Sequence, residues 1–460
     1  MKKWLVVAAL LGLASPFTAQ AQQRFPQADV DRGRYLATAG DCAACHNAPG
    51  TGQGTMAGGY PIVSPLGTIY SSNITPSRTH GIGDYTEAQF ARALREGVRA
   101  DGARLYPAMP YPSYGGLTDT DIHALYAYFM QGVAPVDRSP PKTKLPFPFN
   151  LRLSMTGWNA LFLSKGALVP DPAHDAQWNR GRYLAETLGH CSTCHSPRGF
   201  LMQESKSAAL GGSPLGAWYA PNITSDRVSG IGGWSKAEIG QYLSTGHVTG
   251  KAQAAGDMAD AVTNSFSRMT PADIDAIATY IATVPAVRDP DARQVSYAIG
   301  APGHFEAGLR GSADATGGAH LYSGLCASCH GRDGAGTADG TLPSLFHNST
   351  VGATRPDNLV AVILHGVDRT VGDRHVLMPG FGDNSFVQSL SDEQIATLAT
   401  FIRQSFGPGD AVSVAQVATA RKGGPSSILL PAARIGLVAV AILLFGIALW
   451  TLRRRTHRQT

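Results

Sequence analysis

The chain has 460 residues, which is too long for a single hydrophobic core and indicates several domains. Its formal net charge is +5, but both ends of the chain are basic, and residues 22–420 carry 29 basic against 33 acidic side chains. The excess of basic side chains lies at the two ends of the chain. The charge of residues 22–420 therefore excludes the broad basic surface that is typical of a nucleic-acid-binding protein.

The N-terminal stretch has the three parts of a secretory signal peptide. Lys2 and Lys3 precede an apolar run over residues 4–13, and an A-x-A cleavage pattern follows at 19–21. The sequence therefore predicts a signal peptide over 1–21 and export of the remaining chain.

A C-x-x-C-H motif occurs three times and uses all six cysteines. Two thiols at this spacing can form thioethers with one porphyrin, and the histidine can bind its iron. A single C-x-x-C would also suit a thioredoxin-like pair or half of a zinc site, but three copies that each carry a histidine disfavour both. The sequence therefore predicts three covalently bound haem c groups. Their predicted attachment and proximal residues are Cys42, Cys45, His46, Cys191, Cys194, His195, Cys326, Cys329 and His330.

The stretches around the motifs recur. Residues 31–46 match 179–195, and residues 317–330 form a weaker third copy. Apolar positions at helical spacing predict a short helix before each motif. Residues 71–98 match 220–247 and predict a loop followed by a helix, and each copy then ends in an amphipathic closing helix. The expected N-caps of these helices are Thr86, Ser235, Thr118, Thr270 and Ser391.

These repeats predict an all-α fold of three tandem cytochrome c-like domains and a C-terminal transmembrane helix. A haem would replace much of the core that about 100 residues struggle to build alone. The expected segments are cytochrome c domains over 25–137, 176–290 and 313–408, linkers over 138–175 and 291–312, a tether over 409–434 and a transmembrane helix over 435–452. The proline-rich part of the first linker is expected to pack along the surface.

A methionine is expected as the sixth iron ligand in each domain, since it favours the reduced iron. Met109 and Met378 each precede a proline in a loop ahead of a closing helix. Met258 follows His195 by 63 residues, the interval that Met109 keeps from its own motif histidine, whereas Met269 occupies a position expected in the core. The predicted iron ligands are His46, Met109, His195, Met258, His330 and Met378.

Several other polar residues near the motifs are expected to have ordinary roles. His375 stands three residues from Met378 and is a rival ligand. Asn73 and Asn222 recur in N-I-T and are expected to shape a turn, the alternative being a bond to a haem propionate. The remaining histidines of interest have no repeated counterpart; they are His80, His247, His304 and His365.

The C-terminal region contains 18 residues without a charge, Ile435–Leu452, which is about the minimum for a membrane-spanning helix. Arginines follow at 453–455 and 458, and such a cluster favours the cytoplasmic side. The sequence predicts a protein on the periplasmic face of the bacterial inner membrane, held by one C-terminal span with its C-terminus in the cytoplasm.

The order of these features resembles a known family. A signal peptide, three C-x-x-C-H units, the stretches "NITP", "GIGDY" and "LPFPFNLRLSMTGWN" and a C-terminal anchor are similar to the three-haem cytochrome c subunit of bacterial membrane-bound dehydrogenases for gluconate, sorbitol, fructose or alcohols. The resemblance implies a non-catalytic subunit that relays electrons from a dehydrogenase catalytic subunit to ubiquinone. It also implies a flavin-type catalytic partner, with quinoprotein or molybdenum partners as alternatives, and a small third subunit.

Two other classes remain open. A cytochrome c subunit of a terminal oxidase or other respiratory complex would share these motifs. A multi-haem peroxidase would need one haem with an open sixth position, and a candidate methionine in every repeat argues against it. We find no nucleotide-binding fingerprint, nucleophile elbow or H-E-x-x-H motif.

Overall fold

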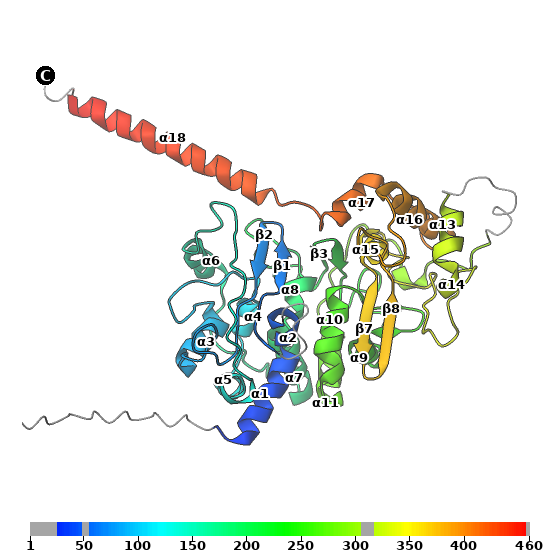
Figure 1. The fold of residues 1–460 in the computed structure, drawn as a ribbon, viewed down its shortest axis with the longest axis horizontal. Coiled ribbons are helices and arrows are strands. Elements are labelled where there is room, and N and C mark those ends of the chain that lie inside the picture. The colour runs from blue at the N-terminus through cyan, green and yellow to red at the C-terminus, as the bar shows by residue number, and fades with distance from the viewer. Residues whose placement is uncertain (1–24, 48–54, 305–316, 457–460) are drawn as a thin grey trace, which may run out of the picture.

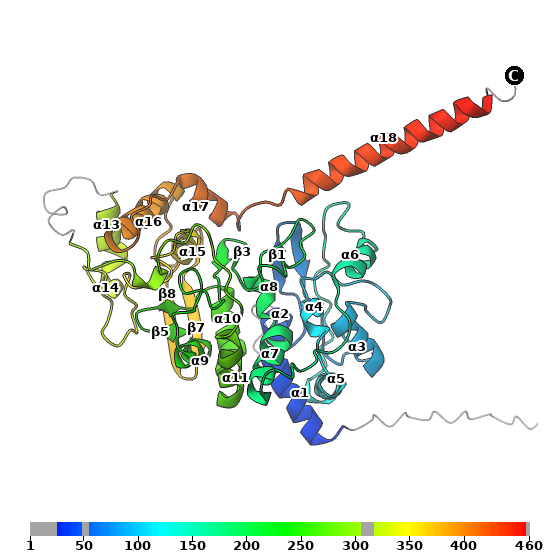
Figure 2. The same cartoon turned by 180° about the vertical axis from the view of Figure 1, so that it is seen from behind.

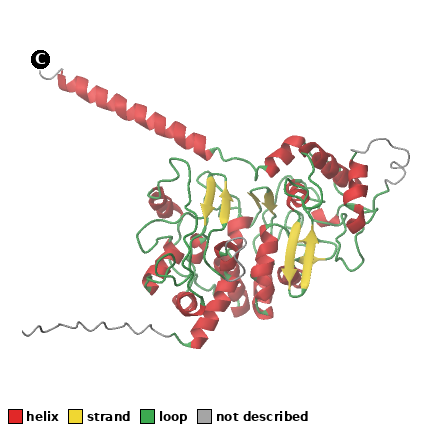
Figure 3. Ribbon diagram, in the orientation of Figure 1, coloured by secondary structure: helices red, strands yellow, loops and turns green. Residues whose placement is uncertain are grey.

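The computed structural model describes residues 25–47, 55–304 and 317–456, so the predicted signal peptide lies outside the described residues. The described chain is mostly helical, with short two-stranded hairpins between the helices (Figure 3). The three sequence repeats follow one another across the molecule, and the second lies between the first and the third (Figure 1). A single long helix, α18, extends away from the body, as the view from behind also shows (Figure 2).

The first two repeats have parallel element orders. The first contains α1 (Gln27–Ala39), α2 (Cys42–His46), β1 (Pro61–Ser64), β2 (Gly67–Tyr70), α3 (Glu87–Glu96), α4 (Tyr111–Tyr114), α5 (Asp119–Ala127) and the π turn η1 (Tyr128–Gly132). The second contains α7 (Ala176–Tyr183), the π turn η2 (Leu184–Leu188), α8 (Cys191–His195), β3 (Ser213–Leu215), β4 (Trp218–Ala220), α9 (Lys236–Thr245), β5 (His247–Val248), β6 (Ala252–Gln253), α10 (Asp257–Asn264), η3 (Phe266–Arg268) and α11 (Pro271–Ile281).

The third repeat is shorter and leads to the C-terminal helices. After η4 (Ser296–Ala298) it contains α13 (Gly318–Leu325), α14 (Ala327–His330), α15 (Asp357–His365), β7 (Val367–Val371), β8 (Arg374–Met378) and α16 (Asp392–Phe406). The chain then forms α17 (Val414–Arg421) and α18 (Leu429–Thr456), while α6 (Ser154–Phe162) lies between the first and second repeats.

The predicted helix starts are confirmed. Thr86, Ser235 and Ser391 form capping boxes at the starts of α3, α9 and α16. Thr118 and Thr270 accept hydrogen bonds from backbone N–H groups in the first turns of α5 and α11. These caps satisfy N–H groups that have no partner within the helix.

Four two-stranded antiparallel hairpins depart from the predicted all-α class. The pairs β1–β2 and β3–β4 occupy matching places in the first two repeats. Each turns at a glycine with positive φ, Gly67 at 127° and Gly216 at 58°, a conformation that glycine adopts without a Cβ penalty. Strands of two to five residues carry too little alternation to predict from sequence.

A π turn absorbs the one-residue length difference between the first two repeats. The segment from the repeated R-G-R-Y to the motif histidine is one residue longer in the second copy, 179–195 against 31–46. In the second copy α7 widens into η2, whereas α1 continues as a regular α-helix. A π turn holds one extra residue inside a helix, so the apolar face of the helix is kept before the motif.

Two glycines let the N-terminal helix of each of these repeats cross its closing helix at close range. A Cβ at Gly33 would lie 1.9 Å from the carbonyl oxygen of Ala124 in α5. A Cβ at Gly181 would lie 1.9 Å from the carbonyl oxygen of Ala276 in α11. No side chain fits at these points. The glycine of each repeated R-G-R-Y stretch is therefore the point where the two helices cross.

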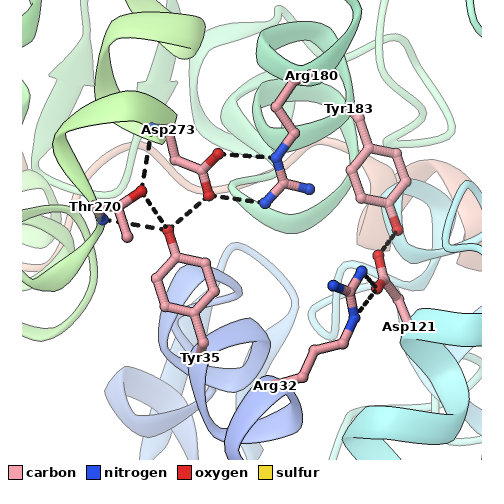
Figure 4. Close-up of polar contacts among 7 residues, drawn as sticks. All are labelled: Arg32, Tyr35, Asp121, Arg180, Tyr183, Thr270 and Asp273. Atoms are coloured by element: carbon pink, nitrogen blue, oxygen red, sulfur yellow. Dashed lines mark hydrogen bonds and ion pairs between the residues drawn. The ribbon is translucent and has the colours of Figure 1, made fainter. Parts of the chain in front are cut away.

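The residues beside these glycines form a reciprocal contact that we call the tyrosine–aspartate lock (Figure 4). It consists of Arg32, Tyr35, Asp121, Arg180, Tyr183 and Asp273. Arg180 Nε donates to Asp273 at 2.8 Å within the second repeat, and the equivalent Arg32 bond measures 3.1 Å. Tyr35 donates across to Asp273 at 2.6 Å, and Tyr183 donates across to the first repeat's aspartate at 2.5 Å. Each tyrosine therefore bonds the other repeat.

The first two repeats also share an apolar core. One continuous cluster of buried side chains includes Leu36 and Phe90 of the first repeat and Leu184 and Ile277 of the second. The third repeat has a separate cluster around α15 and α16. The first two repeats are thus joined through their cores, whereas the third contacts the second through β7 and α15.

The segments predicted as linker and tether contain ordered helices. α6 lies within the first linker, and α17 packs against α16 with Val417 fully buried. Arg421 fixes the end of α17 by ion pairs with Asp383 and Asp392. The flexible part of the tether is therefore shorter than its composition suggests.

The side chain of Asp273 is 13% exposed. Burial alone would raise its pKa, but hydrogen bonds from Arg180 and Tyr35 hold the pKa of Asp273 below its usual range. A carboxyl with a lowered folded-state pKa stabilises the fold above its unfolded-state pKa and loses that contribution as pH falls through the folded-state value.

We therefore expect Asp273→Asn to lower the free energy of unfolding by about 2 kcal/mol at neutral pH, because Arg180 keeps a partly buried charge without its carboxylate. The difference from the wild type should begin to shrink below about pH 4, the usual aspartate range, and should be smallest once the pH has fallen through the lower folded-state pKa of Asp273. Denaturant unfolding of the holoprotein across this pH range measures it. Asp275→Asn, in the same helix but paired with Lys236 at the surface, should cost at most about 1 kcal/mol. Equal losses in both variants would contradict the lock.

Candidate haem-binding sites

Each C-x-x-C-H motif lies on a short helix that directly follows the N-terminal helix of its repeat. The motif helices are α2, α8 and α14, and α14 begins one residue later because Cys326 is its N-cap. All six cysteines have free thiols in the structure. The two thiols and the histidine of each motif are thus presented together on one helical turn.

The three motif histidines share one orientation. The Nδ1 atom of His46 lies 2.7 Å from the carbonyl oxygen of Ser72, that of His195 lies 2.7 Å from Pro221, and that of His330 lies 2.9 Å from Pro343. A carbonyl can only accept, so Nδ1 carries the proton and Nε2 keeps its lone pair. Such a bond to the far ring nitrogen orients a metal-binding histidine.

The histidines are neutral at physiological pH. Burial lowers the pKa of His46, His195 and His330, and this outweighs the opposite effect of the carbonyl hydrogen bond. A neutral imidazole with a free Nε2 is the form that binds iron. The structure therefore presents three histidines in the protonation state that an iron ligand needs.

The cysteines do not have the character of catalytic thiols. Burial raises the pKa of Cys42, Cys191 and Cys326 to about 12, so these thiols are protonated at neutral pH. A reactive cysteine has a lowered pKa instead. Among the described residues there is no cluster of three or more histidine, cysteine or acidic side chains suited to a metal ion. Both findings disfavour the thioredoxin-like and zinc alternatives.

The second and third motifs open into one cavity of about 680 Å³. Both candidate methionines of these repeats line it, and Met269 does not. The relevant lining residues are Cys191, Cys194, His195, Met258, Cys326, Cys329, His330 and Met378. Met269 is instead 8% exposed in the apolar core, as expected from its place before α11. The second and third sites are therefore adjacent parts of one space.

The first site is built against the core that the first two repeats share. Cys42 and Met109 are both partly buried and pack against that core. Met109 lies in the loop between α3 and α4, and Pro110 follows it as the N-cap of α4. The surroundings of Met109 thus agree with its predicted role.

The rival ligand His375 is engaged elsewhere. Its Nε2 atom lies 2.8 Å from a carboxylate oxygen of Asp368, on the neighbouring strand of the β7–β8 hairpin, and the pair is exposed. His375 does not line the cavity, whereas Met378, at the end of β8, does. The geometry favours Met378 over His375.

The repeated N-I-T stretches form turns, as predicted, and the turns have a function. Asn73 accepts hydrogen bonds from the backbone and side chain of Thr75, at 2.9 and 2.7 Å. Asn222 makes the same two bonds to Thr224. Each asparagine directly follows the residue whose carbonyl accepts the Nδ1–H hydrogen bond of the motif histidine. The turn therefore fixes the carbonyl that orients the motif histidine. In the sequence, the repetition of N-I-T was the only sign of this role.

Helix α10 connects all three sites, and sequence reasoning missed this. It carries Met258 of the second site, packs against α2 of the first motif and also contacts β7 of the third repeat. In addition, the residues before the first two motifs, Asp41 and His190, adopt left-handed backbone conformations with φ of 49° and 35°. Such strained residues turn the chain sharply into the motif helix.

These features define a c-type cytochrome, a protein that holds haem covalently through C-x-x-C-H motifs. A family model described as cytochrome c matches residues 30–132. A second, described as cytochrome C oxidase, cbb3-type, subunit III, matches residues 313–402.

Similar proteins show which kind of c-type cytochrome this chain is. The chain is 47% identical over 447 residues to the fructose dehydrogenase cytochrome subunit of Gluconobacter japonicus, covering 93% of this chain and 92% of that one. It is 41% identical to the cytochrome c subunit of the quinone-type alcohol dehydrogenase of Gluconacetobacter polyoxogenes, covering 88% and 87%. It is 39% identical to the gluconate 2-dehydrogenase cytochrome c subunit of Pantoea cypripedii, covering 91% and 95%. The chain belongs to the family of dehydrogenase cytochrome c subunits, and it transfers electrons as part of a dehydrogenase complex.

Replacing Asn222 with alanine tests the role of the N-I-T turn. Thr224 would lose the acceptor for its buried backbone N–H, and the carbonyl of Pro221 would no longer be fixed, so we expect a stability loss of about 1–3 kcal/mol with the haem still attached. The weaker hydrogen bond to His195 should also raise the potential of one haem, since that bond makes the imidazole a stronger donor. Redox titration and unfolding of the holoprotein measure both effects. Thr279→Ala, in α11 of the same repeat and not among the residues that line the cavity, should leave all potentials unchanged.

Proposed function

We propose that this chain carries three haem c groups and relays electrons from a periplasmic dehydrogenase catalytic subunit to membrane ubiquinone. The observation that supports it most strongly is the common geometry of the three motifs, in which each histidine donates Nδ1–H to a backbone carbonyl. When bound, a haem supplies an iron that alternates between ferric and ferrous states. The chain's own residues attach, orient and shield it.

The arrangement of sites supports a relay with the second site in the middle. The second and third motifs line one cavity, and α10 links the second site to the first motif helix. We infer axial ligation by Met109, Met258 and Met378, since a thioether raises the potential and suits transfer over storage of electrons. Three tandem cytochrome c domains on one chain would then act as a single conductor.

The C-terminal helix supports attachment to a membrane. Leu429–Thr451 has a mean hydropathy of 2.4, and none of its apolar window is buried against the body. At 23 residues it is long enough to span a bilayer. We propose that α18 anchors the body on the periplasmic face, with the C-terminus in the cytoplasm, because arginines follow the apolar stretch.

The relatives support a dehydrogenase as partner. They belong to fructose, alcohol and gluconate dehydrogenases, and of these three the fructose dehydrogenase subunit has the highest identity to this chain. We infer a flavin-type catalytic subunit together with a small third subunit. A terminal-oxidase role has one specific observation in its favour, the cbb3-type match over 313–402, but it covers only the third repeat.

Mass spectrometry and reconstitution test the proposal directly. The mature chain should carry three covalent haems and lack residues 1–21. Alone it should oxidise no sugar, acid or alcohol, and with its dehydrogenase in membranes it should restore substrate-dependent ubiquinone reduction. A mass with two haems would refute the three-site relay. Ready carbon monoxide binding at one haem would favour a multi-haem peroxidase. Co-purification with a copper–haem oxidase would favour a subunit of a terminal oxidase.

Paired methionine variants test the ligand assignment. Met258→Ala should leave its haem attached, because Cys191 and Cys194 hold it, but should lower that haem's potential and weaken the thioether-to-iron absorption band. Met269→Ala should destabilise the fold by about 2–5 kcal/mol through lost packing, with an unchanged spectrum. Redox potentiometry and spectroscopy of the holoprotein distinguish them. The reverse pattern would show that Met269 is the ligand.

A further inference from the structure

The segment between the first two repeats has a charge pattern unlike that of the body. Residues 138–170 carry five basic side chains and no carboxylate, whereas residues 22–420 together have more acidic than basic groups. Three of the five, Lys142, Lys144 and Lys165, are exposed and make no ion pair with any residue that the structure describes. The segment is therefore a local positive surface on a negatively charged body.

The polar groups of this segment hold it rigidly against the first repeat. Tyr106 donates a hydrogen bond to the carbonyl of Phe149 at 2.8 Å, and the guanidinium of Arg152 lies 4.5 Å from the centre of the Tyr106 ring. Asn159 in α6 is 8% exposed and accepts a hydrogen bond from Tyr111 at 2.7 Å. The segment therefore has one defined conformation and a defined outward face.

That outward face is apolar. We call it the linker surface; it consists of Phe147, Leu151, Leu153, Leu161, Val169, Phe200 and Leu201. Leu153 is 81% exposed and Leu161 is 71% exposed, although both belong to a segment fixed in place. The loop that carries Phe200 and Leu201 is tied to α6, because Trp158 Nε1 donates to the carbonyl of Leu201 at 2.9 Å. Large fixed apolar side chains gathered on a surface mark an interaction site.

The linker surface is continuous with the base of the proposed anchor. Gly423 of the tether lies beside Val63 in β1, and Val63 is itself 69% exposed. The turn of the same hairpin, at Gly67, packs against Leu145 and Pro146, which directly precede Phe147 of the linker surface. In both views α6 and the β1–β2 hairpin lie on the side of the body from which α18 extends (Figures 1 and 2).

We propose that the linker surface is a second membrane contact, which lies in the headgroup region of a bilayer containing anionic phospholipid. This rests on the proposed anchoring by α18. Apolar side chains flanked by lysines suit that region, since the apolar groups enter the acyl boundary and the ammonium groups meet lipid phosphates. With the base of α18 as one contact and the linker surface as another, the body would have a fixed tilt on the membrane.

A protein partner fits this surface less well. Protein interfaces are enriched in tryptophan, tyrosine and arginine and depleted in lysine. On the linker surface the exposed groups are phenylalanine, leucine and valine, while Trp158 and Arg152 are turned toward the body. Long lysine side chains beside aliphatic groups are typical of the lipid interface, where they extend toward the phosphates.

Thiol labelling of the full chain tests the proposal. Because all six native cysteines lie in haem-attachment motifs, a cysteine introduced by Leu161→Cys would be the one free thiol of the holoprotein, and the unsubstituted chain should not label. In vesicles of phosphatidylglycerol and phosphatidylethanolamine, a membrane-impermeant maleimide should modify it about tenfold more slowly than in phosphatidylcholine vesicles. Adding Lys142→Glu and Lys165→Glu should remove most of this protection.

Two further single-cysteine variants separate the possible outcomes. Gln241→Cys, exposed on α9 and distant from the linker, should label equally fast in both vesicles. Leu443→Cys, within α18, should be unreactive in both, which shows that the anchor has inserted. Fast labelling at 161 with protection at 443 would overturn this inference alone, and fast labelling at both would overturn the anchor as well. Protection at 161 only when the dehydrogenase is bound would identify a protein interface and also overturn it.

Discussion

The close crossing of two helices in each of the first two repeats is the constraint on which the rest of the structure depends. At Gly33 and Gly181 the backbones meet so closely that a methyl group would overlap a carbonyl oxygen. This closeness carries the neighbouring arginine to the aspartate of the closing helix and directs the next tyrosine toward the other repeat. One glycine therefore sets both the internal packing of a repeat and its contact with its neighbour.

The same crossing determines where the haem sites lie. The helix that crosses at Gly33 is followed directly by the first motif helix. The helix that crosses at Gly181 is followed by a π turn and then by the second motif helix. Because the lock and the shared core hold these helices in one relation, the two motif helices are held as well. The proposed relay would need constant distances between its centres. A reciprocal pair of partly buried hydrogen bonds provides this without a covalent link.

The placement of each motif on one helical turn could be predicted from the sequence because it is local. The cysteines and histidine of a motif lie within one helical turn, and the caps at Thr86 and Thr270 act within three residues. The carbonyl acceptors could not be predicted in this way, since Ser72 and Pro221 each lie 26 residues beyond their histidines. The shared cavity and the central position of α10 depend on how the repeats pack, which no single segment encodes.

The departures from the predicted fold follow the same rule. The helices of the repeats have a strong apolar period, whereas the hairpins are too short to show one, and α17 is recognisable only when it packs against α16. α6 has a different reason. Its Trp158 contacts the buried Tyr111, but Leu161 and, just before the helix, Leu153 stay exposed, so its sequence suggests a linker. Exposed leucines of this kind fit the membrane contact proposed above, and the flanking lysines, set on an otherwise acidic body, suit a negatively charged partner.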